Sequence, residues 1–131
     1  MIVADASAII ELLLQTAFGT RVEERLYGDS DEIHAPHLLD LEVVSALRRF
    51  VIKGDITAER AAEAIHDLMS LRIIRHAHVD FLERAWELRD NVTAYDAIYI
   101  ALAESLDAAI VTCDGPLSRS HGHYAHIELI G

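Results

Sequence analysis

The sequence predicts an α/β fold in which one domain, residues 1–131, forms an α/β/α sandwich around a mainly parallel sheet. Two observations lead to this prediction. Short apolar runs of strand length alternate with longer stretches of helical periodicity, which is the pattern of a parallel sheet covered by helices. In addition, 131 residues with 52% hydrophobic and 25% charged side chains are sufficient for one sizeable core and are typical of a folded globular chain.

The first part of the chain predicts two strands and three helices. MIVAD and EIHA are apolar runs of strand length, and the second of the helices between them stops at Gly28. Pro36 and Gly54 delimit the third helix, because proline favours the first helical position and glycine the position after the last. The expected strands are 1–5 and 32–35, and the expected helices are 6–15, 20–27 and 36–53. The core-facing stripe of the third helix is predicted to be Val43, Ala46, Leu47, Phe50 and Val51.

The middle of the chain predicts two helices with a strand between them. Thr57 is a favourable cap for the first helix, RIIRHA at 72–77 is the strand candidate, and the second helix ends near Asp90 and Asn91. Apolar residues recur at helical spacing in both helices. Their core faces are predicted to be Ala61, Ile65, Leu68 and Met69 in the first and Phe81, Leu82, Ala85, Trp86 and Leu88 in the second.

The last part of the chain contains its most hydrophobic helix, expected over 94–106. After Asp96 the segment is apolar on nearly every side, which predicts a helix buried all round. Thr93 and Asp96 also match a capping box, so this carboxylate has a purely structural interpretation as well. AAIVTCD and HIELI then predict strands at 108–114 and 126–130.

Composition excludes several classes of protein. Asp5 and Glu11 interrupt the first apolar run and argue against a secretory signal, and no run is long enough to span a membrane, so we expect a cytoplasmic protein. The single cysteine, Cys113, is expected to be a small buried hydrophobe. With 22 acidic residues against 11 Lys and Arg, a diffuse basic surface for nucleic acid is excluded. Solubility or cation binding would account for the acids.

Four acids lie at predicted core margins. Asp5 and Asp114 end two strands, where parallel sheets form their sites, although each is equally suited to cap the next helix. Glu42 borders the apolar stripe of its helix, a position where glutamates often pack only their stems. If these three and Asp96 converged, they would repel one another without a counter-ion. Carboxylate oxygens and water are the ligands that Mg²⁺ or Mn²⁺ requires.

Four segments carry a family resemblance: IVADAS at 2–7, HLLDLEVVSALRR at 37–49, TAYDAIYIALAESL at 93–106 and VTCDGPL at 111–117. With them the whole chain resembles the PIN-domain family, and within it the VapC-type toxins of bacterial toxin–antitoxin pairs. The resemblance is weakest over 16–35 and 55–80. It implies that the metal site, for Mg²⁺ or alternatively Mn²⁺, consists of Asp5, Glu42, Asp96 and Asp114.

The resemblance also implies an activity and partners. The chain would be a metal-dependent endoribonuclease that hydrolyses RNA with a metal-activated water, that pairs with a cognate antitoxin, and that forms a homodimer. A catalytically idle PIN-like module that serves as a binding or regulatory partner is the alternative. A receiver-like domain would need two acids after the first strand and a late lysine, whereas Lys53 is the only lysine. A haloacid-dehalogenase-like phosphatase would need Asp-x-Asp where this chain has Asp5-Ala6-Ser7.

Several residues have secondary roles in this interpretation. Ser7 and Thr112 resemble supporting positions of the family, although a helix cap and an ordinary strand residue explain them equally well. Some relatives carry a further acid where this chain has residues 115–118, so one-metal and two-metal chemistry both remain open. The candidate RNA contacts are Arg48, Arg49, Lys53 and Arg119, with solvated helix-end charges as the alternative. His121 and His123 suggest zinc, but a closed ligand set is lacking.

Overall fold

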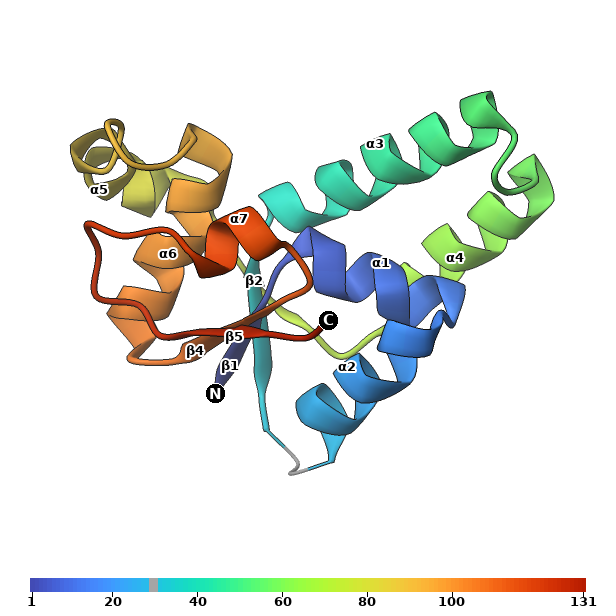
Figure 1. Cartoon of the computed structure of the whole chain (residues 1–131), viewed down its shortest axis with the longest axis horizontal. Coiled ribbons are helices and arrows are strands. Elements are labelled where there is room, and N and C mark those ends of the chain that lie inside the picture. Colours follow the sequence, from blue (N-terminus) through green and yellow to red (C-terminus); the bar gives the residue numbers. More distant parts are fainter. Residues whose placement is uncertain (29–30) are drawn as a thin grey trace.

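The computed structural model describes residues 1–28 and 31–131 and contains one five-stranded sheet (Figure 1). The strands lie in the order β3-β2-β1-β4-β5, and each neighbouring pair is parallel. Their bounds are Ile2–Ala4 for β1, Ile33–Pro36 for β2, Ile74–His76 for β3, Ala109–Thr112 for β4 and Ile127–Leu129 for β5. The predicted parallel sheet is confirmed.

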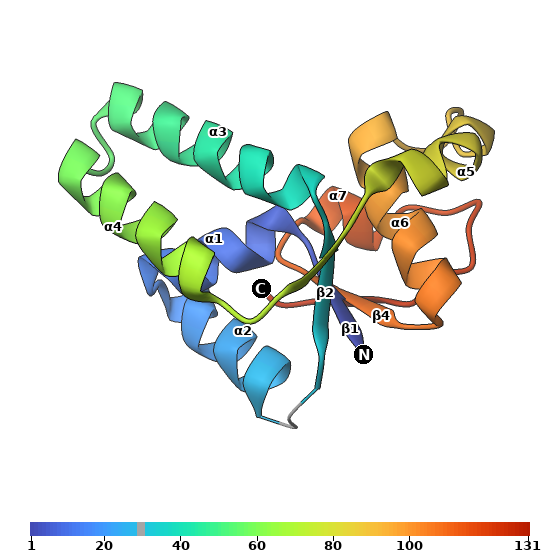
Figure 2. The ribbon, with the colours of Figure 1, turned by 180° about the vertical axis from the view of Figure 1, so that it is seen from behind.

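Helices cover both faces of this sheet, as the two opposite views show (Figures 1 and 2). Helices α1 to α4 lie on one side and α5 and α6 on the other, so the predicted α/β/α sandwich is confirmed. The bounds are Ala6–Leu14 for α1, Ala17–Tyr27 for α2, Leu38–Lys53 for α3, Ala58–Ser70 for α4, Leu82–Glu87 for α5, Ala94–Leu106 for α6 and Gly115–Ser118 for α7, with a 3₁₀ turn at His78–Phe81.

The alternation of side chains along the strands explains the two layers. Ile2 and Ala4 of β1 pack against α1 to α4, whereas Val3 between them packs against α5 and α6. Successive residues of a strand point to opposite faces, so one short apolar strand contributes side chains to the core on each side of the sheet. Helix α6 is buried without interruption from Ala97 to Ala103, as its apolar sequence predicts.

Several predicted boundaries need correction. Helix α2 begins at Ala17 rather than at residue 20, because the hydroxyl of Thr16 accepts a capping hydrogen bond from the Gly19 N–H at 3.1 Å. Pro36 ends β2 instead of opening α3. The short helix α7 was not predicted. Gly54, in contrast, ends α3 with a φ of 80°, as expected of a glycine after a helix.

Three apolar residues predicted for the core are exposed instead. Met69 in the last turn of α4 is 76% exposed, while Leu82 and Trp86 in α5 are 52% and 68% exposed. Helix α5 is only six residues long, and it buries Ala85 and ends at the buried Leu88, which leaves its flanks in solvent. Within the described ranges, no helix is both long enough and apolar enough to span a membrane.

Candidate functional site

The two acids predicted at strand ends do meet at one edge of the sheet. Chain order reverses between β1 and β4, which pair in parallel with Ala4 opposite Val111. Such a reversal opens a crevice at the carboxyl ends of the strands. Asp5 follows β1 directly and Asp114 follows β4 by two residues, so both lie at this crevice.

The carboxylate of Asp5 is buried and held by three donors. Its Oδ1 accepts hydrogen bonds from the Ser7 hydroxyl at 2.7 Å and from the Ala8 N–H at 3.0 Å, and its Oδ2 accepts one from the Thr112 hydroxyl at 2.5 Å. The capping role that the sequence allowed is therefore real, since Asp5 caps α1. Both supporting residues named from the sequence contact this one carboxylate.

The same hydroxyls tie Asp5 to the loop that carries Asp114. Ser7 Oγ accepts a hydrogen bond from the Cys113 N–H at 2.9 Å, and Thr112 Oγ1 accepts one from the Asp114 N–H at 2.9 Å. Asp114 occupies the N-cap position of α7, yet its side chain accepts no capping hydrogen bond. A hydrogen-bond network thus joins the two strand ends and leaves the Asp114 carboxylate without a capping role.

Glu42 and Asp96 reach the cluster from helices on opposite sides of the sheet, α3 and α6. The Thr93 hydroxyl caps α6 by accepting a hydrogen bond from the Asp96 N–H at 3.2 Å, so the threonine half of the predicted capping box is present. The other half is absent from the hydrogen bonds between described residues, where the Thr93 N–H does not donate to the Asp96 carboxylate. Glu42 Oε1 accepts a 2.6 Å hydrogen bond from the Tyr99 hydroxyl. Tyr99 is not among the site residues predicted from the sequence, because an aromatic residue in an apolar helix is ordinarily a core residue.

The four acids act on one another electrostatically. Burial raises the pKa of Asp5, Glu42 and Asp96, and neighbouring carboxylates raise each further: Asp114 acts on Asp5 and on Asp96, while Asp5 and Asp96 both act on Glu42. None of the ion pairs between described residues involves any of the four. They form one cluster of negative charge without a cationic side chain paired to it.

The donor chemistry of this cluster fits a hard divalent cation. Over residues 1–28 and 31–131, no three His, Cys, Asp or Glu side chains already stand in a metal-binding arrangement. Magnesium does not require one, because it commonly takes one or two carboxylates and keeps several waters. The pair His121 and His123 is a poorer candidate for a metal site, because both ring nitrogens of His123 already have partners. Nε2 lies 2.9 Å from the Ser120 hydroxyl, and Nδ1 accepts a hydrogen bond from the Ala125 N–H at 3.1 Å.

Two open cavities border the acid cluster. One, of about 660 Å³, is lined by Glu42 and Asp114 together with Arg49. The other, of about 610 Å³, is lined by Asp96 together with Arg119, Arg89 and His121 among others. Each side of the cluster therefore has a cavity that contains both acid and arginine.

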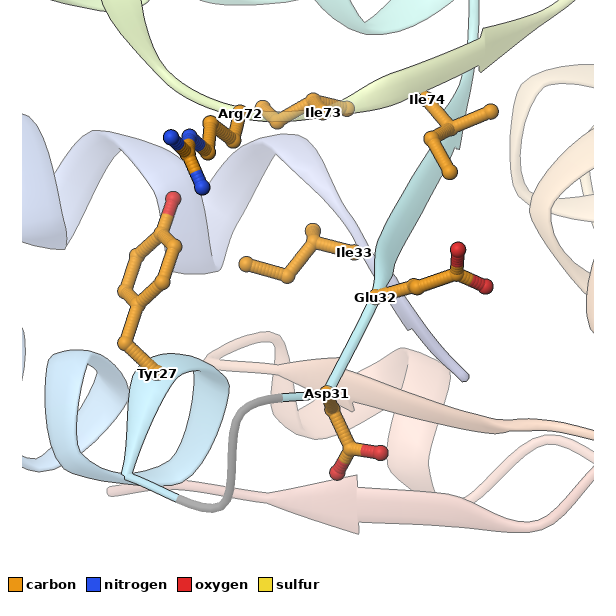
Figure 3. Close-up of a pocket in the computed structure, with 7 residues that line it drawn as sticks. All are labelled: Tyr27, Asp31, Glu32, Ile33, Arg72, Ile73 and Ile74. Carbon is orange, nitrogen blue, oxygen red and sulfur yellow. The ribbon is translucent and has the colours of Figure 1, made fainter.

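The remaining predicted cations lie elsewhere. Arg48 lines a separate, mostly apolar groove between α3 and α4, and Lys53 is the exposed last residue of α3. A further cavity of about 570 Å³ lies where β2 and β3 begin, at the opposite end of the strands from the acids. There the Tyr27 hydroxyl and the Arg72 guanidinium point toward each other (Figure 3). None of the predicted site residues lines it.

Comparisons with known proteins agree with this architecture. Residues 2–120 match the PIN domain family. Ribonuclease VapC12 of Mycobacterium tuberculosis is 42% identical over 130 residues, which is 99% of each chain. Among solved structures, the sarcin–ricin loop cleaving toxin VapC20 of Mycobacterium tuberculosis has a TM-score of 0.67 at 18% identity, covering 95% of this chain and 97% of that one. A toxin–antitoxin complex from Klebsiella pneumoniae has a TM-score of 0.69 at 15% identity, covering 100% and 98%.

Proposed function

The chain belongs to the PIN-domain family, and from this premise we propose that it is a Mg²⁺-dependent endoribonuclease, the toxin of a toxin–antitoxin pair. The observation that carries the proposal is the cluster of Asp5, Glu42, Asp96 and Asp114 at the switch point of the sheet, in which Asp114 raises the pKa of Asp5 and Asp96, and Asp5 and Asp96 raise the pKa of Glu42. The relatives named as ribonucleases support RNA as the substrate, and the toxin–antitoxin complex of similar fold supports the role in a pair.

The four carboxylates would hold Mg²⁺, with Mn²⁺ as the alternative. When bound, the ion lowers the pKa of a water and neutralises charge on the phosphate. The protein contributes position: the donors from Ser7, Ala8 and Thr112 fix Asp5 in one orientation. A cysteine nucleophile is unsuitable here, because burial raises the pKa of the Cys113 thiol to about 11 and keeps it protonated.

The RNA strand would cross the acid cluster from one cavity to the other. Overall the chain repels RNA, since its net charge is −11. Local cations must therefore offset the repulsion, and Arg49 and Arg119 are the two predicted cations that line the bordering cavities. Arg48 and Lys53 lie outside both.

Arg49→Gln and Arg119→Gln should each weaken RNA binding, and each should reduce the dependence of affinity on salt. For single strands the slope of log K against log[salt] changes by about 0.7 for each phosphate that the protein no longer neutralises. Fluorescence anisotropy with a single-stranded RNA across a salt series measures both quantities. Arg48→Gln and Lys53→Gln are the matched controls and should behave like the wild type. Equal effects from all four variants would contradict the proposed path.

An antitoxin would inhibit the enzyme by inserting a basic peptide into the acidic groove. An arginine among these carboxylates would form bidentate hydrogen bonds and supply positive charge in place of the cation. None of the four acids forms an ion pair with another described residue, and this supports the proposed mode of inhibition.

A homodimer would bury apolar side chains that the α3–α4 pair exposes. Leu41, Ile52 and Met69 are 72%, 66% and 76% exposed. Light scattering of the 14.6 kDa chain should give twice the monomer mass, and Ile52→Glu together with Met69→Glu should shift it toward the monomer. A monomer at every practical concentration of the wild type would contradict the dimer.

The function itself is tested by mapping RNA ends. Purified free of its partner and supplied with Mg²⁺, the protein should produce a restricted set of new 5′-phosphate ends in total RNA. Asp96→Asn, prepared in parallel, controls for contaminating nucleases. If the wild type yields the same ends as this variant, the idle interaction module becomes the better description.

A further inference from the structure

Tyr99 donates a side-chain hydrogen bond to the acid cluster from outside the network that holds Asp5. It lies in α6, three residues after Asp96, so both side chains leave the same face of that helix. Its ring is 2% exposed, and its hydroxyl donates to Glu42 Oε1 at 2.6 Å across the gap between α6 and α3. One buried helix thus supplies both an acid and a donor to the site.

We propose that Tyr99 is a positioning residue that holds Glu42 in the orientation required for divalent-cation binding. The inference rests on the proposed function, because it assumes that the acid cluster binds a cation. A phenol suits this task, since it carries no charge and donates a single hydrogen bond. It therefore restrains Glu42 without neutralising its charge, which an arginine or lysine would do, and its single hydrogen bond leaves Oε2 available.

The restraint matters because Glu42 sits on α3, which supplies none of the donors that fix Asp5. Glutamate is a flexible side chain, and ordering it costs conformational entropy. A hydrogen bond formed before the cation arrives removes part of that cost from the binding step. Outer partners of metal ligands typically affect metal affinity by about 10–100-fold for this reason.

A purely structural role is the competing explanation. Buried tyrosines generally find a partner for the hydroxyl, and Glu42 could simply be the nearest acceptor. In that case the loss of the hydroxyl would change the stability of the metal-free protein but not its affinity for a cation. The two roles are therefore separated by a binding measurement that needs no RNA.

The experiment is a calorimetric titration of the metal-free protein with Mn²⁺, comparing the wild type with Tyr99→Phe. We expect the dissociation constant of Tyr99→Phe to rise by about tenfold. Tyr27→Phe is the control, because it removes the same hydroxyl from a tyrosine that lines the separate cavity at the opposite end of the strands from the acids. It should bind Mn²⁺ like the wild type. Circular dichroism of each metal-free variant verifies the fold.

A double-mutant cycle with Glu42→Gln shows whether Tyr99 acts through Glu42. In the Glu42→Gln background, Tyr99→Phe should have no further effect on Mn²⁺ affinity. An unchanged or tighter affinity in Tyr99→Phe overturns the inference, and so does an equal loss in both backgrounds. If the wild type itself binds no Mn²⁺, the proposed metal dependence fails first and the inference fails with it, which distinguishes the two failures.

Discussion

Each of the four amide variants, Asp5→Asn, Glu42→Gln, Asp96→Asn and Asp114→Asn, is expected to lose RNA cleavage by at least about a hundredfold, the upper range seen when only an outer partner of a ligand is removed. An amide keeps the shape of the side chain but not the charge that holds a divalent cation. A gel assay with RNA at fixed Mg²⁺ measures the loss. Glu59→Gln removes an exposed acid from α4 and should cleave like the wild type.

The four variants should differ in stability even if they agree in activity. Asp5 accepts hydrogen bonds on both oxygens and caps α1, and the amide nitrogen of asparagine cannot accept. Asp5→Asn should therefore be destabilised, typically by about 1–3 kcal/mol for an unsatisfied buried group. Activity persisting in any two of the four variants, at matched purity and metal, would overturn the assignment of the site.

Asp114→Asn is expected to melt higher than the wild type when metal is absent. Its carboxylate makes no capping hydrogen bond, and its charge raises the pKa of both Asp5 and Asp96, so its neutralisation relieves repulsion with little loss. Each like-charged pair costs about 1 to 4 kcal/mol, depending on the effective dielectric. For a domain of this size, relief of about 1 kcal/mol corresponds to a melting temperature several degrees higher.

Magnesium should reverse this order. The ion binds only the folded cluster, so millimolar Mg²⁺ should raise the melting temperature of the wild type by linkage and should raise that of Asp114→Asn less. Thermal melts of both proteins in EDTA and in Mg²⁺ test this expectation. If Mg²⁺ changes neither protein and Asp114→Asn is neutral or destabilised, the acids are separate helix caps.

The direction of the pH dependence follows from the same raised pKa values. Because Asp5, Glu42 and Asp96 have higher pKa values in the folded protein, the folded state binds more protons than the unfolded state above about pH 4. Their contribution to stability is fully present below that pH and is lost as the pH rises through the raised values. As the pH rises from about 4 through the raised pKa values, the metal-free wild type should lose more stability than Asp114→Asn, because Asp114 contributes to the raised pKa of Asp5 and Asp96.

The sheet and the placement of two of the four candidate acids could be predicted from the order of elements alone. Strand ends fix Asp5 and Asp114 at one edge, because parallel strands share a direction. Glu42 and Asp96 lie on helices whose packing angles the sequence does not reveal, so their place in the cluster came from the family resemblance. The same limit explains why Arg49 and Arg48, adjacent in sequence, line different cavities.

Other features needed tertiary context. Trp86 fits a helical stripe, but α5 is too short to cover it, and its ring instead lies 4.6 Å from the Arg89 guanidinium. Tyr99 could have been found from one signal, a hydroxyl three residues after the acid of an otherwise apolar helix. That signal gains meaning only once α3 is known to place Glu42 opposite it.

The most direct test of a single metal-dependent site is RNA cleavage during a Mg²⁺ titration of EDTA-treated protein, with Asp96→Asn in parallel. We predict that the wild type is inactive in EDTA and that Mg²⁺ restores cleavage to a saturating rate, while the variant stays inactive throughout. Cleavage by the wild type at an undiminished rate in EDTA, or equal recovery by Asp96→Asn, would contradict a single metal-dependent site.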